Sequence, residues 1–415
     1  MATGDSPFYD QLEVRDPEER ERALFRALPG LLRHAVERAP LYRKRLGAVD
    51  PDQMRDRKAL AGLPVLRKSE LIQLQEQDPP FGGLLAADQS RLVHIFQSPG
   101  PLFEPQAARG DYWRMARALY AAGIRSGDLV HNSFSYHLTP AGFMLDGGAR
   151  ALGCPVFPGG TGQSELQLAA IARLRPRAYV GTPSFLRILL EKAEELGMPR
   201  PSFAKALVSG EAFPRELQER LARDYGIDGY QCYATAECGL IAYESPAREG
   251  LIVDEGVLLE IVRPGTDEPL PEGEVGEVVV TVFNPDYPLI RFGTGDLSAV
   301  LPGPSPCGRT NMRIRGWLGR ADQTAKVRGM FVHPRQIDDI RRRFNAARAR
   351  LEITSEEGRD RMVLLLEVEG AEEGLVERVA EAIRAVTGLR GEVRLVPPGT
   401  LPNDGKIIDD LRGRG

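Results

Sequence analysis

Between residues 90 and 230, short apolar runs alternate with longer segments in which apolar side chains recur every three or four positions. The short runs predict strands at Leu92–Phe96, Leu129–Asn132, Ala178–Gly181 and Ala206–Val208. The longer segments predict helices at Tyr112–Ala122, Ser164–Leu174 and Pro183–Leu196. Strands that alternate with helices in this way are typical of a parallel sheet covered by helices. This part of the chain is therefore expected to be α/β.

The pattern differs on either side of this region. Residues 18–45 have helical spacing, and Pro29-Gly30 is expected to divide them into two helices. Residues 250–300 hold strand-like runs between Gly- and Pro-rich turns, which favours a distorted β-barrel. From about residue 320, mixed helices and strands predict a small α+β domain. We therefore expect a large domain over residues 1–320 and a small one over residues 321–415.

The composition is that of an ordinary globular protein and excludes several classes of partner. Of 415 residues, 42% are hydrophobic and 27% charged, and the net charge of −4 gives no reason to expect nucleic acid or an anionic membrane. The N-terminus lacks the features of a signal peptide, and no run approaches the roughly 20 apolar residues of a membrane span. The four cysteines are irregularly spaced, unlike a disulfide framework. The expected compartment is the cytoplasm.

Three separated segments in the second half of the chain carry candidate chemistry. They read Arg-Phe-Gly-Thr-Gly-Asp at 291–296, Gly-Arg-Ala-Asp at 319–322 and Leu-Pro-Asn-Asp-Gly-Lys at 401–406. Earlier segments that match in the same order read Ser-Gly-Glu-Ala-Phe-Pro at 209–214 and Tyr-Ala-Thr-Ala-Glu at 233–237. With these elements the chain resembles the phenylacetate–coenzyme A ligase family of the adenylate-forming superfamily, over nearly its whole length.

This resemblance implies a fold and a reaction. The fold is the adenylate-forming one: a large N-terminal region of α/β layers and a β-barrel, and a small mobile α+β C-terminal domain. The reaction uses ATP and Mg²⁺ to convert an aryl, phenylacetate-like acid into an acyl-adenylate and pyrophosphate. The thiol of coenzyme A then attacks and AMP leaves. The implied partners are the aryl acid, ATP and coenzyme A, and a homodimer is implied by the resemblance alone.

The resemblance also implies roles for individual residues. Asp296 would accept hydrogen bonds from the ribose hydroxyls. Glu237 would hold Mg²⁺ through carboxylate oxygen, and Lys406 would bridge the attacking carboxylate and the α-phosphate. Arg320 would reach the phosphates, and Asp322 would be the hinge of the C-terminal domain. The residues implied around the adenine are Ser209, Gly210, Glu211 and Tyr233.

Aromatic residues after the strand expected at Leu129–Asn132 leave two interpretations open. Tyr136 and Phe143 could line a pocket for an aryl acid, which the family uses for its substrate. They could equally be buried aromatic residues of the α/β core.

The segment that should bind phosphate departs from the family. The family reads SSGTTGKP, whereas residues 97–105 read Gln-Ser-Pro-Gly-Pro-Leu-Phe-Glu-Pro, so that Ser98, Gly100 and the last proline match. A phosphate cradle needs glycines, hydroxyls and free backbone N–H groups, and two prolines remove two of these donors. Glu104 stands in place of the lysine and repels phosphate. These changes are expected to weaken the binding of a triphosphate.

Two functions fit this mixture of kept and lost elements. In the first, the chain still adenylates an acid, because the altered loop contacts mainly the β- and γ-phosphates, which leave. In the second, the chain keeps the fold but no longer uses ATP, and it binds or processes an acyl-CoA or a nucleotide. Cys238, next to Glu237, would then be either a nucleophile or a buried inert thiol. We favour the first.

Overall fold

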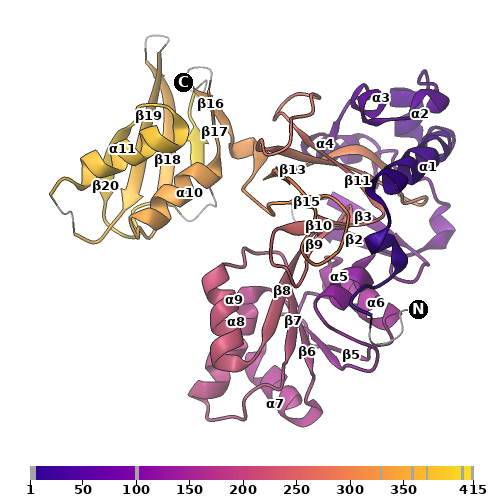
Figure 1. The fold of residues 1–415 in the computed structure, drawn as a ribbon, viewed down its shortest axis with the longest axis horizontal. Coiled ribbons are helices and arrows are strands. Elements are labelled where there is room, and N and C mark those ends of the chain that lie inside the picture. The colour runs from indigo at the N-terminus through magenta and orange to yellow at the C-terminus, as the bar shows by residue number, and fades with distance from the viewer. Residues whose placement is uncertain are drawn as a thin grey trace. The chain divides into compact units, whose positions relative to one another are not determined.

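The computed structural model describes residues 6–98, 102–327, 330–356, 359–370, 373–402 and 406–412. The chain forms two compact units, one of residues 1–294 with 299–317 and the other of residues 295–298 with 318–415 (Figure 1). None of the helices in the described residues combines the length and the apolar character needed to cross a membrane.

The centre of the larger unit is a mixed sheet. Its strands are β4 (Val130–Asn132), β5 (Val156–Pro158), β6 (Ala178–Gly181), β7 (Lys205–Val208), β8 (Asp228–Thr235), β9 (Gly239–Glu244), β10 (Leu251–Val253), β14 (Val300–Leu301) and β15 (Arg313–Ile314). They lie in the order β14-β15-β10-β9-β8-β7-β6-β4-β5. The pairs from β5 to β8 are parallel, and the pairs from β8 to β14 are antiparallel.

Side chains alternate between the two faces of this sheet, and helices cover both. The helices are α5 (Met115–Ala121), α6 (Ala141–Ala151), α7 (Ser164–Leu174), α8 (Pro183–Glu195) and α9 (Arg215–Tyr225). In β6, Ala178 and Val180 belong to a core with α5 and α6, whereas Tyr179 belongs to a core with α7, α8 and α9. Figure 1 shows α5 and α6 on one side of the strands and α8 and α9 on the other. The predicted α/β layering is thus confirmed.

A second sheet, a hairpin and the N-terminal helices complete the larger unit. The strands of this sheet are β1 (Leu66–Arg67), β11 (Val257–Val262), β12 (Gly276–Val282) and β13 (Leu289–Ser298), in the order β1-β13-β12-β11. The hairpin strands are β2 (Leu92–Ser98) and β3 (Leu102–Ala107). The helices are α1 (Pro17–Arg38), α2 (Pro40–Leu46), α3 (Arg57–Ala61) and α4 (Lys68–Gln77). One apolar core joins α1, α2 and the second sheet.

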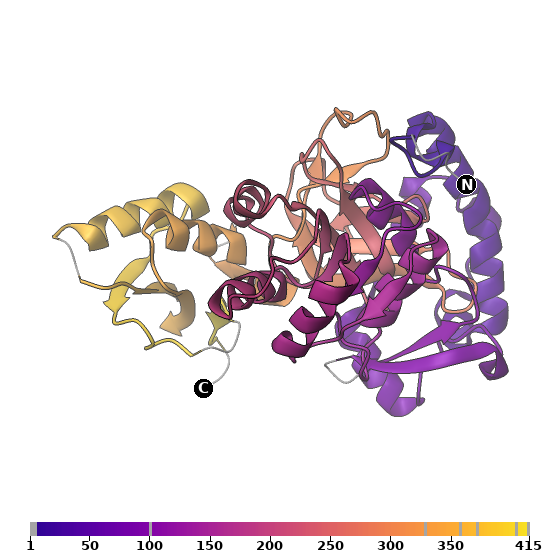
Figure 2. The ribbon, with the colours of Figure 1, turned by 90° about the horizontal axis from the view of Figure 1, so that it is seen from below.

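The division of the first helix at Pro29-Gly30 is wrong. α1 continues through Pro29, and Figure 2 shows it as one long indigo helix at the right of the view. Phe25 and Leu28 before the proline, and Leu31, Leu32 and Ala35 after it, are buried in one core. The burial of this continuous apolar stripe outweighs the backbone hydrogen bond that the proline removes.

The smaller unit is α+β. Its strands are β16 (Ala325–Val327), β17 (Met330–Val332), β18 (Ala349–Glu356), β19 (Arg359–Glu367), β20 (Glu392–Val396) and β21 (Ile408–Asp410), and its helices are α10 (Pro334–Arg343) and α11 (Leu375–Thr387). The strand order β20-β19-β18-β21 makes the main sheet, and β16 and β17 form a hairpin. Ile337 of α10 and Val379 of α11 share one core with Leu351 and Leu364 of the sheet. The predicted fold class is confirmed.

Candidate active site

The carboxyl ends of the parallel strands in the larger unit meet at one edge of the sheet. In open α/β sheets, ligands bind outside these ends. Ser209, Gly210 and Glu211 follow β7 directly, and Tyr233 lies near the end of β8. The sheet topology therefore brings the predicted adenine-side residues to this edge.

Local contacts hold the turn after β7 in place. The Ser209 hydroxyl donates to the carbonyl of Cys232 on β8, at 2.9 Å. Gly210 has a φ of 81°, which favours glycine. Glu211 accepts from the Ser184 hydroxyl at 2.8 Å, at the beginning of α8. Glu211 thus has a structural partner, and its predicted role toward adenine stays a prediction.

Tyr233 is fixed by a residue of the second sheet. Its hydroxyl donates to Oγ1 of Thr294 at 3.1 Å, and the Thr294 hydroxyl in turn donates to the carbonyl of Val278 at 3.1 Å. Tyr233 is half-buried. An aromatic ring held in this way could stack against a base.

Glu237 lies in the turn after β8 and contacts a residue that the sequence did not single out. Its Oε1 is 2.7 Å from Nζ of Lys68, the first residue of α4. The Glu237 side chain is 0% exposed and the Lys68 side chain 28% exposed, so the ammonium is the accessible member of the pair. Among the described residues, neither Glu237 oxygen has a hydrogen bond of good geometry.

These residues do not fit a magnesium ion bound directly to Glu237. The space beside the carboxylate is taken by an ammonium, and a dication there would meet like charge at close range.

The hairpin β2–β3 does not form a phosphate cradle in its described part. The Ser98 hydroxyl donates to Glu104 Oε1 at 2.5 Å. The Phe103 N–H donates to Gln75 of α4 at 2.8 Å, and the Phe103 carbonyl accepts from the Gln75 amide at 2.9 Å. Gly100 lies outside the described residues. The hydroxyl and the N–H that are described are therefore engaged inside the protein.

Glu104 is buried in this hairpin. Burial above all, together with the charge of the nearby Glu237 carboxylate, raises the pKa of Glu104 to about 8, against the opposing effects of the hydrogen bond from Ser98 and the charge of Lys68. The carboxyl at the position of the family's lysine is therefore mainly neutral at pH 7, and it repels phosphate less than its charge in the sequence suggests.

The raised pKa of Glu104 predicts a pH-dependent stability. The folded state keeps a proton that the unfolded chain, with the ordinary pKa of 4.5, has lost. Stability should therefore fall as the pH rises from about 4.5 to about 8, by up to about 1.4 kcal/mol per pH unit, and then level off. Urea unfolding between pH 5 and pH 9 measures this, and Glu104→Gln should flatten the profile. The exposed Glu216→Gln is the control, and an equal slope in all three proteins would contradict the prediction.

The predicted substrate residues Tyr136 and Phe143 lie together. Their ring centroids are 5.3 Å apart, and Phe143 is 5.2 Å from Phe96 of β2. The Tyr136 hydroxyl accepts from Asn132 Nδ2 at 2.8 Å. Tyr136 and Phe143 are half-buried, so part of each ring is accessible to a ligand.

In the smaller unit, the two charged residues predicted for the nucleotide form an ion pair. Arg320 Nη1 is 3.0 Å from Asp296 Oδ1, and the backbones of these residues form an isolated antiparallel bridge. A Cβ on Gly295, which has a φ of 75°, would be 2.7 Å from Arg320 Nη2. Glycine at this position therefore lets the guanidinium lie over the backbone. The side chain of Asp322, the predicted hinge, lies outside the described residues.

Lys406 lies on a segment that is fastened on both sides. Leu401 donates its N–H to the buried Glu367 at 2.6 Å, and its carbonyl accepts from Arg348 at 2.9 Å. After the lysine, the Ile407 N–H donates to Gln323 at 2.9 Å. Lys406 Nζ donates to Asp409 Oδ1 at 3.2 Å.

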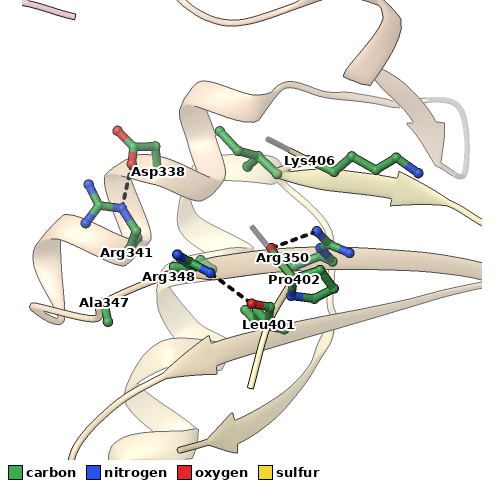
Figure 3. Close-up of a pocket in the computed structure, with 10 residues that line it drawn as sticks. Asp338, Arg341, Ala347, Arg348, Arg350, Leu401, Pro402 and Lys406 are labelled. Carbon is green, nitrogen blue, oxygen red and sulfur yellow. Dashed lines mark hydrogen bonds and ion pairs between the residues drawn. The ribbon is translucent and has the colours of Figure 1, made fainter. Parts of the chain in front are cut away.

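A cavity of about 280 Å³ adjoins this segment and is lined in part by arginines. Its polar lining residues are Asp338, Arg341, Arg348, Arg350 and Lys406. Figure 3 shows Arg348 and Arg350 reaching toward Leu401 and Pro402, and Lys406 extending away from Asp338 and Arg341. Arg348 directly precedes β18 and Arg350 lies on it, and their hydrogen bonds to the carbonyls of Leu401 and Pro402 hold the backbone there.

This anchoring predicts that Arg348→Met slows the step that uses Lys406. Loss of one charged hydrogen bond costs on the order of 1.5 kcal/mol, so pyrophosphate release should slow by about tenfold, with little change in the KM for ATP. Arg335→Met, which removes an exposed pair with Asp339, is the matched control. Equal rates for both variants would show that the anchor does not position Lys406.

The chain is similar in sequence to a family of enzymes and to several characterised proteins. The AMP-binding enzyme family matches residues 134–282. The chain is 30% identical over 441 residues to the phenylacetate–coenzyme A ligase of Thermus thermophilus, covering 95% of this chain and 98% of the relative. It is 28% identical over 436 residues to the enzyme of that name from Escherichia coli K12, covering 97% of each chain.

Solved structures show the same fold. An open conformation of a 2-hydroxyisobutyryl-CoA ligase, in complex with 2-HIB-AMP and CoA, matches with a TM-score of 0.87 and 25% identity, over 99% of this chain and 96% of that one. A benzoate CoA ligase from Burkholderia xenovorans LB400 shares the fold at a TM-score of 0.53 and 16% identity, over 78% of this chain and 69% of that one. The chain belongs to the phenylacetate–coenzyme A ligase family and is an acid–thiol ligase of the adenylate-forming class.

Proposed function

We propose that the protein activates an aryl, phenylacetate-like acid with ATP and transfers the acyl group to coenzyme A. The relatives at about 30% identity are phenylacetate–coenzyme A ligases. The accessible aromatic rings of Tyr136 and Phe143 support an aryl group over a small aliphatic one.

The observation that carries this proposal is the anchored segment of Lys406. Hydrogen bonds at Leu401, before Lys406, and at Ile407, after it, hold the chain on both sides of the lysine. In the proposed reaction a carboxylate oxygen attacks the α-phosphorus, the bond to pyrophosphate breaks, and the Lys406 ammonium offsets the charge that accumulates. The thiol of coenzyme A then attacks the acyl carbon, its proton passes to solvent, and AMP leaves.

Asp296 and Arg320 would bind the rest of the nucleotide. The Asp296 carboxylate accepts the ribose hydroxyls, and Arg320, which is already paired with it, reaches the phosphates. The ion pair with Arg320 orients the carboxylate toward the ribose in this proposal.

A second function is favoured by the hairpin β2–β3. The engagement of Ser98 and Phe103 inside the protein suits a homologue that no longer uses ATP and that binds or processes an acyl-CoA or a nucleotide. Covalent chemistry at Cys238 does not suit it, because burial raises the pKa of that thiol to about 12.

The deciding experiment is acid-dependent release of pyrophosphate from ATP, with and without coenzyme A. The panel contains phenylacetate, benzoate, 2-hydroxyisobutyrate and short aliphatic acids. Release that depends on one aryl acid and forms its coenzyme A thioester would support the proposed ligase. No release with any acid, from folded protein that binds AMP or an acyl-CoA, would favour the second function.

A further inference from the structure

Lys68 places a cation where the altered hairpin lacks one. The family's phosphate loop ends in a lysine, and this chain has Glu104 there. Lys68 comes instead from the beginning of α4. Its positive charge acts against the rise in the pKa of Glu104 and of Cys238, the residue that follows Glu237. An ammonium thus lies in the same region of the larger unit as the missing lysine, supplied by a different element.

Two buried polar side chains lie close to the Glu237 carboxylate that this ammonium meets. They are Glu104 and Tyr287, since the charge of Glu237 acts on both. Burial, and then the charges of Glu237 and Glu104, raise the pKa of Tyr287. The ammonium of Lys68, 2.7 Å from Glu237, is therefore the cation of a polar cluster in the larger unit.

We propose that Lys68 binds the β- and γ-phosphates of ATP, and that Glu237 is the positioning residue that holds its ammonium rather than a magnesium ligand. This inference rests on the proposed use of ATP. The exposed fractions of the two side chains support these two roles, because the Glu237 carboxylate is fully buried and the Lys68 ammonium is accessible. A carboxylate without access to solvent can orient a neighbouring cation, whereas only the accessible cation can meet phosphate.

Charge balance fits the same assignment. With Glu104 neutral, the Lys68–Glu237 pair has no net charge, and the buried Glu104 adds no repulsion. With Glu104 ionised, the cluster is negative and repels phosphate. The binding of pyrophosphate should therefore weaken as the pH rises past about 8, the pKa of Glu104.

The test measures binding by calorimetry, with inorganic pyrophosphate, ATP and AMP as probes and no acid present. Lys68→Met should weaken the binding of pyrophosphate and of ATP at least tenfold and leave AMP unchanged. Glu237→Gln should have a similar but smaller effect, and the double variant should be no weaker than Lys68→Met, since both changes act on one interaction. Lys68→Arg should recover part of the loss.

Lys205→Met is the matched control. Lys205 is 25% exposed and forms a 2.8 Å pair with Asp228, so this variant also removes a half-buried ion pair. Near-ultraviolet circular dichroism establishes that each variant is folded. Unchanged pyrophosphate binding in folded Lys68→Met overturns the assignment. A higher Mg²⁺ requirement in Glu237→Gln, with pyrophosphate binding intact in Lys68→Met, shows that Glu237 is a metal ligand after all.

These outcomes are separate from those for the ligase. If pyrophosphate binding depends on Lys68 and no acid yields turnover, the cation assignment stands and the ligase proposal fails. If Lys68→Met activates an acid as fast as the wild type with the same KM for ATP, the ligase stands and Lys68 has no part in phosphate binding.

Discussion

Arg291→Met should be the most destabilising single substitution considered for this protein, lowering the free energy of unfolding by about 3–5 kcal/mol. Arg291 is fully buried on β13, and its guanidinium forms two bonds to the Glu260 carboxylate of β11, at 2.9 and 3.0 Å. It also donates to the carbonyls of Ala61, Leu63 and Asp267. Methionine would leave Glu260 as an unpaired buried charge and would free three carbonyls at once.

Urea unfolding at pH 7 measures this effect, and two further variants serve as its controls. Arg22→Met removes an exposed pair with Glu18 and should change stability by less than about 0.5 kcal/mol. Arg291→Met with Glu260→Met should recover part of the loss, because the unpaired carboxylate is gone while the three carbonyls still lack a donor. A cost below about 1 kcal/mol for Arg291→Met would mean that water or a rearranged chain replaces the guanidinium.

The elements that the sequence predicted best are those whose signals are local. The helix expected at Ser164–Leu174 matches α7, and the strand expected at Ala178–Gly181 matches β6. A predicted helix boundary was wrong where side-chain hydrogen bonds determine the first residue of the helix. The helix expected from Tyr112 begins at Met115, because the Asp111 carboxylate accepts the N–H groups of Met115 and Ala116.

The contacts that shape the candidate site could not be predicted, because they join residues far apart in the sequence. Nothing in the residues around Lys68 indicates that its ammonium meets Glu237. Arg291 and Asp296 are the first and last residues of one motif. Arg291 pairs with the buried Glu260, so this motif contains both a structural residue and a candidate binding residue. A motif gives the residue types and their order, whereas burial and partners distinguish the two roles.

Lys406→Ala should slow adenylation by about 10²–10³-fold, the loss expected when a positioned group that offsets transition-state charge is removed. The ammonium acts only while negative charge accumulates at the α-phosphorus. The second step, attack of the coenzyme A thiol on a supplied acyl-adenylate, should therefore keep its rate within a few fold. Acid-dependent pyrophosphate release measures the first step, and thioester formation from chemically prepared acyl-adenylate measures the second.

The ratio of the two rates distinguishes this role from a structural one. Lys406 pairs with Asp409 of β21, and the N–H of Leu351 on β18 donates to the carbonyl of Ile407, so a damaged segment would slow both steps together. Asp409→Asn removes the partner but keeps the ammonium, and it should slow adenylation far less than Lys406→Ala. The exposed Arg390→Ala controls for the loss of a positive charge from the smaller unit. Equal slowing of both steps in Lys406→Ala would place the lysine in the structure of the segment rather than in the chemistry, because only a group that meets the phosphate can affect one step alone.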